Sequence, residues 1–348
     1  MPVAEQYLGK ATKKDPMTRI LFACVGVTVL AFAQPQNTAS TAKAAASPIP
    51  KAADKRPDLQ GFWTNATITP LERPAQYAGK LTVSDADAAV YEKGQAQDLK
   101  DEDGQSDGPL LRATGSAGVG GYNALFIDRG SEFARVDGGK RTSLIIDPPD
   151  GKVPATTPEA RQRQAALFRN FNNYDNVKVR PLSERCIVGF GSTSGPPMMP
   201  DYFYNNNYQI VQTPDTIMIM VEMIHDVRVI RMNGTHEPSS IKRWLGDSIG
   251  HWDGDTLVID TTNFRADNAF HGASESLHVI ERLRRIDAGT ILYRATIDDP
   301  STWTKPWTIE YPFLSTPGPI FEYACHEGNY AMEDILGGAR RMEAQTKK

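Results

Sequence analysis

Residues 256–297 read TLVIDTTNFRADNAFHGASESLHVIERLRRIDAGTILYRATI, and this stretch decides the fold. It contains three runs of alternating apolar, β-branched and aromatic residues, at 256–264, 277–286 and 290–297. The last two runs are separated only by Asp-Ala-Gly, a sequence that favours a tight turn. The stretch therefore predicts consecutive antiparallel strands joined by short connections.

The same pattern continues on both sides of this stretch. Strands are predicted at 208–212, 216–232, 244–252, 256–264, 277–286, 290–297, 307–314 and 320–323. Asn233-Gly234 and Asp253-Gly254 are further turn signals, because these residues supply the positive φ that two-residue hairpins need. A long meander of strands avoids unpaired edges most simply by closing into a barrel.

The chain before these strands is richer in helix and loop signals. One helix is predicted at 82–100, with Ser84 as its N-cap, and a second at 157–171, with Thr157 as its N-cap. A short strand is predicted at 141–146. We therefore expect a mainly β fold, an antiparallel meander closing into a barrel, with a few helices and long loops from the N-terminal part.

Residues 1–33 have the features of a signal peptide. Basic residues precede the apolar run 20–33, which ends in small residues and is shorter than the roughly twenty residues of a membrane span. Met17 is an alternative start. Cys24 loosely fits a lipoprotein cleavage box, but the apolar run continues past it, which argues against a lipid anchor. We expect a periplasmic or secreted protein without a membrane span.

The remaining chain divides into a tether and one folded domain. Residues 34–56 are mostly Ala, Ser, Thr, Pro and Lys, a composition typical of disordered linkers. Residues 57–345 are expected to form a single barrel-like domain, with 82–206 as a covering segment rich in helix and loop. The net charge is −4, whereas proteins that bind the phosphate backbone of nucleic acids carry an excess of basic residues, so nucleic acid is not an expected partner.

Removal of the leader would leave two cysteines, Cys186 and Cys325. An even pair in an oxidising compartment predicts a disulfide, here closing a loop of about 140 residues. Two buried free thiols are the alternative.

Two sets of residues resemble known families. Residues 58–63 read DLQGFW, which resembles the opening strand of lipocalin-like barrels, where the Trp packs across the barrel floor and the Gly lets the backbone bend. Residues 252–258 (WDGDTLV) and 323–330 (YACHEGNY) resemble a family of exported, largely uncharacterised bacterial proteins. These resemblances imply a lipocalin-like barrel and no particular reaction. The segment 82–206 departs from the lipocalin pattern.

The predicted strand 216–232, TIMIMVEMIHDVRVIRM, carries an unusual set of charges. Alternation places Glu222, Asp226 and Arg228 on one otherwise apolar face, and His225 on the other. The three charged residues would form either a buried network lining a cavity or a structural ladder of ion pairs. His225 is either functional or a core histidine.

The predicted strand 277–286 repeats this theme, with His278 and Arg282 on one face. These two side chains would oppose the acidic face of the earlier strand, and a carboxylate beside an imidazole suits acid–base catalysis. Ordinary cross-strand pairing is the alternative. The candidate catalytic residues are therefore Glu222, His225, Asp226, Arg228, His278 and Arg282.

Other residues are candidates for holding a substrate. Aromatic and amide side chains can stack on and hydrogen-bond a sugar or polyphenol ring, although core packing explains many of them equally well. The candidates are Tyr204, Asn206, Tyr208, Trp303 and the pair His326-Glu327 beside Cys325. Tyr330 stands where a zincin would need its second His, and the sequence has no P-loop, dinucleotide glycine motif or haem-attachment motif. We expect no metal and no cofactor.

Two functions are compatible with this sequence. The first is an exported, cofactor-independent enzyme that acts by acid–base chemistry on a small organic or glycosidic substrate, as a lyase, isomerase or hydrolase. The second is a lipocalin-like binding protein for an apolar or aromatic small molecule. Several charged side chains converging on one cavity would favour the enzyme.

Overall fold

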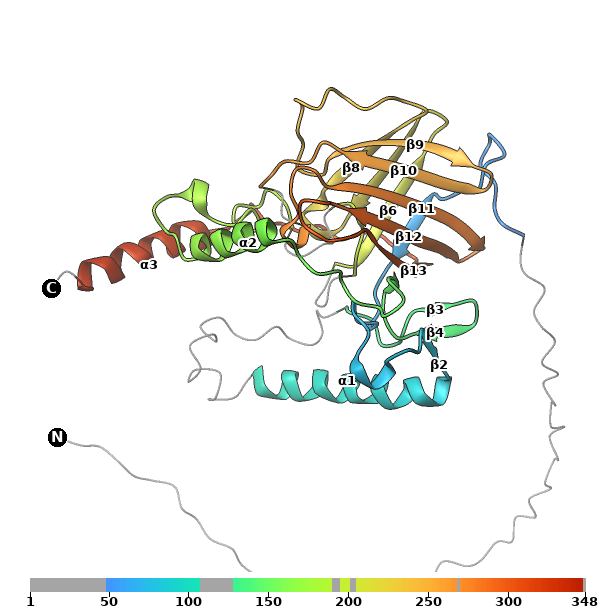
Figure 1. Ribbon diagram of the computed structural model, residues 1–348, viewed down its shortest axis with the longest axis horizontal. Helices are drawn as coiled ribbons and strands as arrows, with labels where there is room; N and C mark the ends of the chain where they lie inside the picture. The colour runs from blue at the N-terminus through green and yellow to red at the C-terminus, as the bar shows by residue number, and fades with distance from the viewer. Residues whose placement is uncertain (1–47, 107–127, 190–194, 201–204, 268–269, 347–348) are drawn as a thin grey trace, which may run out of the picture. The chain divides into compact units, whose positions relative to one another are not determined.

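The fold is mainly β, as the sequence predicts (Figure 1). The computed structural model describes residues 48–106, 128–189, 195–200, 205–267 and 270–346. The predicted signal peptide and residues 34–47 of the predicted tether lie outside these ranges. The described barrel strands are β1 (Gly61–Thr64), β6 (Asn207–Gln212), β7 (Thr216–Val221), β8 (Val227–Met232), β9 (Asp247–Asp253), β10 (Thr256–Thr262), β11 (His278–Asp287), β12 (Thr290–Asp298) and β13 (Trp307–Ser315).

These nine described strands form a closed, mixed barrel. Strand β1 closes it because it pairs with β6 on one side and with β13 on the other, so that Trp63 lies opposite both Tyr208 and Ser315. The short strand β5 (Ile145–Asp147) adds to β13. Closure leaves no unpaired edge along most of the sheet, which is the reason for expecting a barrel from a long meander.

The predicted meander is confirmed for most neighbouring strands and wrong at one place. Between Asp253 and Thr256 the chain makes the predicted two-residue hairpin, with Gly254 at φ +59°. Strands β8 and β9, by contrast, pair in parallel. Asn233-Gly234 therefore makes no hairpin, because the chain must run back along β8 before it can pair with β8 in parallel.

The prediction of one long strand at 216–232 is also wrong. A 3₁₀ turn, η5 (Met223–His225), interrupts it, with Ile224 and His225 at φ 57° and 46°. Strands β7 and β8 form a hairpin instead, and Ile219 lies opposite Arg228. An unbroken strand of this length would extend roughly 55 Å, far beyond its neighbours in the barrel. The turn lets both halves contribute apolar residues to the same core.

Two other strand predictions are corrected. The segment 320–323 forms no strand, and the backbone N–H of Phe321 bonds to the Glu222 side chain instead of to a neighbouring strand. The predicted strand 141–146 is divided between β4 (Gly139–Arg141) and β5. Strand β4 belongs to a separate three-stranded sheet with β2 (Thr82–Val83) and β3 (Arg135–Val136).

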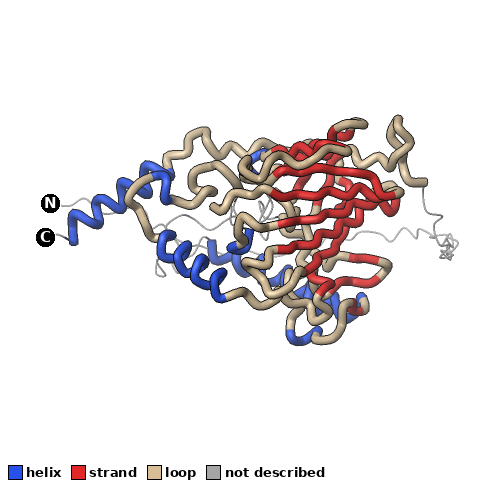
Figure 2. The backbone as a smooth tube through the Cα atoms, turned by 45° about the horizontal axis from the view of Figure 1, so that its top comes forward, coloured by secondary structure: helices blue, strands red, loops and turns tan. Residues whose placement is uncertain are grey.

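Both predicted helices are present, with their predicted caps. The helix α1 (Asp85–Ser106) begins after Ser84, whose Oγ accepts a hydrogen bond from the backbone N–H of Asp87 at 3.2 Å. The helix α2 (Pro158–Phe171) begins after Thr157, whose Oγ1 accepts from the backbone N–H of Ala160 at 3.1 Å. A third helix, α3 (Ala331–Thr346), was not predicted. Figure 2 shows the helices beside the strands rather than among them. The remaining described 3₁₀ turns are η1 (Ala75–Tyr77), η4 (Val177–Val179) and η6 (Phe270–Gly272).

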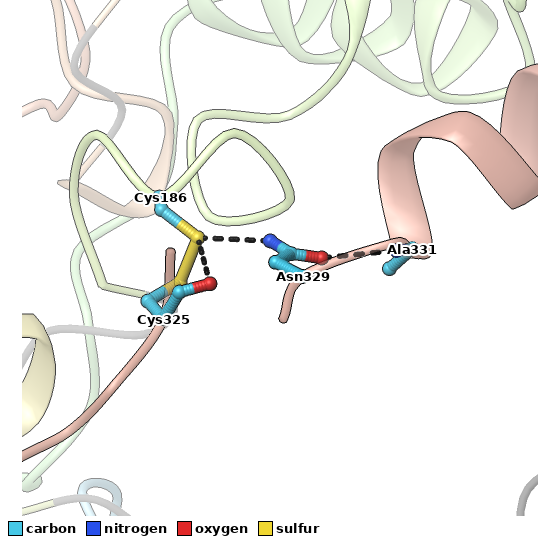
Figure 3. The surroundings of a disulfide bond; sticks show 4 residues. All are labelled: Cys186, Cys325, Asn329 and Ala331. Carbon is cyan, nitrogen blue, oxygen red and sulfur yellow. Dashed lines mark hydrogen bonds between the residues drawn. A yellow bond between two sulfur atoms is a disulfide. The ribbon is translucent and has the colours of Figure 1, made fainter. Parts of the chain in front are cut away.

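The predicted disulfide joins Cys186 to Cys325. Figure 3 shows Asn329 between this bond and the start of α3. The Asn329 amide donates to Cys186 Sγ at 3.1 Å, and its oxygen accepts from the backbone N–H of Ala331 at 3.0 Å. The disulfide and this amide thus attach the C-terminal helix to the segment that follows residue 180.

The barrel core is aromatic and contains a buried ion pair. Trp63 is buried, its indole N–H donates to the Leu59 carbonyl at 2.9 Å, and the Arg285 guanidinium lies 5.1 Å from its ring centre. Arg228 and Glu281 are buried and make a two-pronged ion pair. Burial acts to lower the pKa of Arg228, but the Glu281 carboxylate outweighs it and raises that pKa.

The buried pair predicts a specific pattern of stability. Replacing Arg228 by Met leaves the Glu281 carboxylate buried without its cation, which we expect to lower the free energy of unfolding by about 3–5 kcal/mol. The double variant Arg228→Met/Glu281→Gln should regain most of this loss. Urea unfolding followed by circular dichroism measures both changes. A double variant no more stable than the single one would contradict this account of the pair.

Candidate functional site

A cavity of about 710 Å³ lies beside β8 and the segment that leads into β9. We call it the β8 groove. Its lining residues come from β8, from the segment 237–246, from the start of β9, and from two flanking stretches. They are Ile187, Val188, Asp226, Val227, Arg228, Val229, Arg231, Glu237, Lys242, Arg243, Trp244, Leu245, Gly246, Asp247, Ser248 and Arg265.

Strand alternation places most of this groove outside the barrel. Arg228 and Ile230 are buried with the core, whereas Val227 and Val229 are 45% and 49% exposed. Val227 and Val229 therefore lie on the outer face of β8. The segment before β9 forms a wall because the parallel pairing brings the start of β9 beside the middle of β8, with Ile230 opposite Ser248.

Gly246 fixes how this wall enters β9. Its φ is +71°, a conformation that favours glycine, and an added Cβ would lie 2.6 Å from the Thr261 side chain and 2.7 Å from the Thr262 carbonyl. No other residue type fits this turn without moving β10. The sharp entry explains why β9 begins at Asp247 rather than at residue 244, as predicted.

Asp226 is the residue of the groove best suited to proton transfer. It follows the η5 turn, is partly buried, and its Oδ2 is buried without a hydrogen-bond partner among the described residues. Burial raises the pKa of Asp226 to about 7, and a hydrogen bond from the backbone N–H of Gly189 opposes this only in part. A carboxyl with a pKa near neutrality can both donate and accept a proton under physiological conditions.

The basic residues of the groove differ in how firmly they are paired. Arg228 binds Glu281, and Arg231 binds Asp247 through two bonds of 2.7 and 3.2 Å. Arg265 binds Asp267 and lies 4.1 Å above the Trp244 ring. Lys242 has a more distant partner, Glu275 at 4.0 Å. For the exposed side chain of Arg243, the described part of the chain offers no ion pair.

A chain of carboxylates and imidazoles lies next to the groove, on the outer face of β9, β10 and β11. Asp260 Oδ1 contacts His278 Nε2 at 2.9 Å and His236 Nε2 at 3.1 Å. The other nitrogen of His236, Nδ1, contacts Asp247 Oδ2 at 3.0 Å. His236 thereby connects the segment that walls the groove to two neighbouring strands.

The electrostatics of this chain follow from its pairing. Hydrogen bonding to His278 lowers the pKa of Asp260, and the same bond raises the pKa of His278 against the effect of burial. Burial acts to raise the pKa of Asp247. Hydrogen bonds from Arg231, the Glu237 backbone and His236 outweigh it and lower that pKa to about 2. Asp247 is therefore a permanently charged structural group.

The structure brings few of the predicted catalytic residues together. Asp226 and Arg228 both line the groove, but Arg228 is buried and paired with Glu281. His225 is exposed in the η5 turn, and the two residues of β11 have other partners, namely Asp260 for His278 and Asp253 for Arg282 at 2.6 Å. Glu222 is buried and accepts hydrogen bonds from the Asn207 side chain at 2.8 Å and from the Phe321 backbone at 3.0 Å.

The predicted substrate-binding residues are also dispersed. Tyr208 and Trp303 are fully buried in the core, and Asn206 is buried with its amide donating to the Asp128 carbonyl at 2.6 Å. His326 and Glu327 are exposed beside the disulfide, and Tyr204 lies outside the described residues. Burial, followed by repulsion from Glu222, raises the pKa of Asp128.

The barrel interior near Glu281 is occupied by the protein itself. Tyr293 donates to Glu281 Oε1 at 2.8 Å and accepts from the backbone N–H of Met198, while Tyr311 donates to the Met198 carbonyl at 2.6 Å. Met198 and Met199 are both buried in the core. Glu281, the two tyrosine hydroxyls and the Met198 backbone therefore bond to one another within the core.

Sequence reasoning missed several members of the groove and its neighbourhood. Glu281 had a usable signal, because a single acid alternates with Leu277, Val279 and Leu283 on a face that must be buried. No sequence signal pointed to Lys242, Arg243 and Trp244. They follow a turn whose direction depends on the parallel pairing of β8 with β9.

Known proteins give no further guide to this site. No protein-family model, no curated protein and no solved structure matches the chain. Within the described residues, no three His, Cys, Asp or Glu side chains gather as ligands for a metal ion. None of the described helices is long and apolar enough to cross a membrane.

The raised pKa of Asp226 predicts a pH-dependent stability. Its folded pKa of about 7 exceeds the ordinary value of 3.8, so the folded state loses stability as the pH rises from about 4 to above 7. Asp226→Asn, which resembles the neutral acid, should come closest to the wild type at pH 4, where the folded wild type is neutral at this position and its unfolded state is only partly ionised. At pH 8 it should be more stable, by up to a few kcal/mol. Urea unfolding at both pH values tests this, and equal curves at pH 8 would contradict it.

The His278–Asp260 pair predicts the opposite trend. The stabilisation from His278 is fully present below its ordinary pKa of 6.5 and is lost as the pH rises through its higher folded pKa. His278→Gln should therefore destabilise the protein more at pH 5.5 than at pH 9, by under about 1 kcal/mol because the pair is partly exposed. Arg282→Gln, from the neighbouring exposed pair, is the control and should show no such difference between these pH values.

Proposed function

We propose that this protein is an enzyme that binds a small organic molecule in the β8 groove and transfers a proton through Asp226. The observation that carries the proposal is a partly buried carboxyl with an unpartnered oxygen at the edge of a cavity large enough for a small molecule. Its pKa near 7 supports the same role. Lyases, isomerases and hydrolases all use such a step, and the proposal covers these three classes.

The roles proposed for the other residues differ from those expected from the sequence. Arg228 and Arg282 are paired with Glu281 and Asp253, so neither is placed to steady negative charge on a substrate. Lys242 and Arg243 are better suited, because they line the groove and are less firmly paired. A positive side chain near the reacting atoms lowers the energy of an anionic transition state.

A binding protein is the alternative function. The exposed apolar side chains of Val227 and Val229, together with Trp244, favour it, because such a floor holds an apolar or aromatic molecule without chemistry. This ligand would lie in the groove outside β8 rather than in the barrel interior.

Export and family membership are further proposals. The leader-like residues 1–33 support a periplasmic or secreted location, and the Cys186–Cys325 disulfide suits an oxidising compartment. The buried Trp63 on the first barrel strand is compatible with membership of an exported, lipocalin-like family.

A substrate screen with matched variants tests the proposed function. The purified protein is incubated with a panel of small organic acids, esters and glycosides, and products are detected by mass spectrometry. For any substrate found, we expect Asp226→Asn to lower kcat by about 10²–10⁴-fold. The inflection near pH 7 in the wild-type profile of kcat/KM should disappear in this variant.

The control is Glu237→Gln, which removes another carboxylate of the groove and should keep the inflection. Full activity in Asp226→Asn would contradict the proposed role of this carboxyl. A compound that binds and is recovered chemically unchanged would identify a binding protein instead.

A further inference from the structure

The β8 groove combines an apolar floor with basic walls, and this combination constrains its ligand. Five basic residues and three acidic residues line it. Most of these charges cancel locally, because Arg231 is bound to Asp247, and Arg228 and Arg265 are bound to acids outside the lining, Glu281 and Asp267.

Lys242 and Arg243 remain as the basic residues with capacity for a ligand. Lys242 is 4.0 Å from the exposed Glu275 carboxylate, a distance beyond a hydrogen bond. Arg243 is exposed, and the described residues provide no ion pair for its guanidinium. Within the lining, Glu237 is the acid left to offset these two cations when Asp226 is neutral. Lys242 and Arg243 together with Glu237 give the groove a small net positive charge, which suits a ligand with a single negative group.

The floor and one wall of the groove are apolar. Val227 and Val229 are about half exposed on the outer face of β8, although valine is usually buried. Trp244 is partly buried in the wall and is held under Arg265. Ile187 and Val188 approach from the segment next to the disulfide. A ligand that covers these side chains would remove substantial apolar surface from water.

We propose that the groove binds an organic monoanion, a carboxylate or sulfonate attached to an aromatic or branched apolar body. Lys242 and Arg243 bind the anionic group, and the apolar body packs on Val227, Val229 and Trp244. The inference rests on the proposed function in that it places the ligand in the same groove. It does not require proton transfer by Asp226.

Two fluorescent probes that differ by one charged group test this inference. They are 1-anilinonaphthalene-8-sulfonate and N-phenyl-1-naphthylamine, which share their rings, and only the first carries a sulfonate. Each is titrated into the full-length protein and into the double variant Lys242→Gln/Arg243→Gln. We expect the Kd of the sulfonate to rise about tenfold or more in the double variant. The Kd of the uncharged probe should change less than twofold.

The control variant removes the same charge elsewhere, as Arg284→Gln/Lys305→Gln, two exposed residues that do not line the groove. It should leave both Kd values within twofold of the wild type. Circular dichroism confirms that each variant is folded. Raising the salt concentration should weaken sulfonate binding in the wild type and have little effect in the groove variant.

An unchanged sulfonate Kd in the groove variant would overturn the inference, and so would an equal loss for both probes. Neither result depends on catalysis, because both probes are inert. The proposed function fails separately, if Asp226→Asn keeps its activity and its pH profile. An Asp226→Asn protein that still binds the sulfonate but has lost activity would support both proposals.

Discussion

The ion pair between Arg228 and Glu281 is the interaction on which the arrangement of the barrel depends. A charge of either sign inside an apolar core is strongly unfavourable unless it is paired and hydrogen-bonded, so these two side chains must face each other. Their pairing fixes β8 relative to β11, and the bond from Tyr293 to Glu281 extends the network to β12. Tyr293 and Tyr311 in turn hold the backbone of Met198 inside the barrel. Charged residues in a barrel interior thus have a structural role here, and the groove suited to a ligand lies outside β8.

The groove exists because the meander is interrupted twice. The η5 turn reverses the chain within what would otherwise be one strand, so that Arg228 faces the core while Val227 and Val229 face outward. The parallel pairing of β8 with β9 then requires a return segment, and residues 237–246 of that segment form the wall of the groove. His236 holds this segment against two strands through Asp247 and Asp260. A regular hairpin at Asn233-Gly234 would have provided no wall.

The sequence predicts what depends on local patterns and misses what depends on distant partners. Strand alternation, hairpin signals, helix caps and an even number of cysteines each depend on nearby residues or on composition, and they gave the barrel, two helices and the disulfide. The η5 turn was missed because residues 216–232 contain no Gly, Pro or Asn, and β-favouring residues fill the segment. Asp226 was selected as a candidate for sharing a strand face with Arg228, but it follows the η5 turn and precedes β8, so strand alternation does not place it. The partners expected for it on β11 were wrong, because His278 and Arg282 bond to Asp260 and Asp253 instead.

The acids in and behind the β8 groove differ in whether a cation reaches them. Glu281 and Asp247 are buried and bound by arginine, and the pKa of Asp247 falls to about 2. Asp247, held in this way, stays ionised and takes up no proton near neutral pH. Asp226 receives a backbone N–H on one side and no cation within bonding distance among the described residues, so burial dominates its pKa. The folded state is less stable once Asp226 ionises. Because no cation among the described residues binds the Asp226 carboxyl, its ionisation destabilises the folded state. For the same reason, it is the acid of the groove that can exchange a proton.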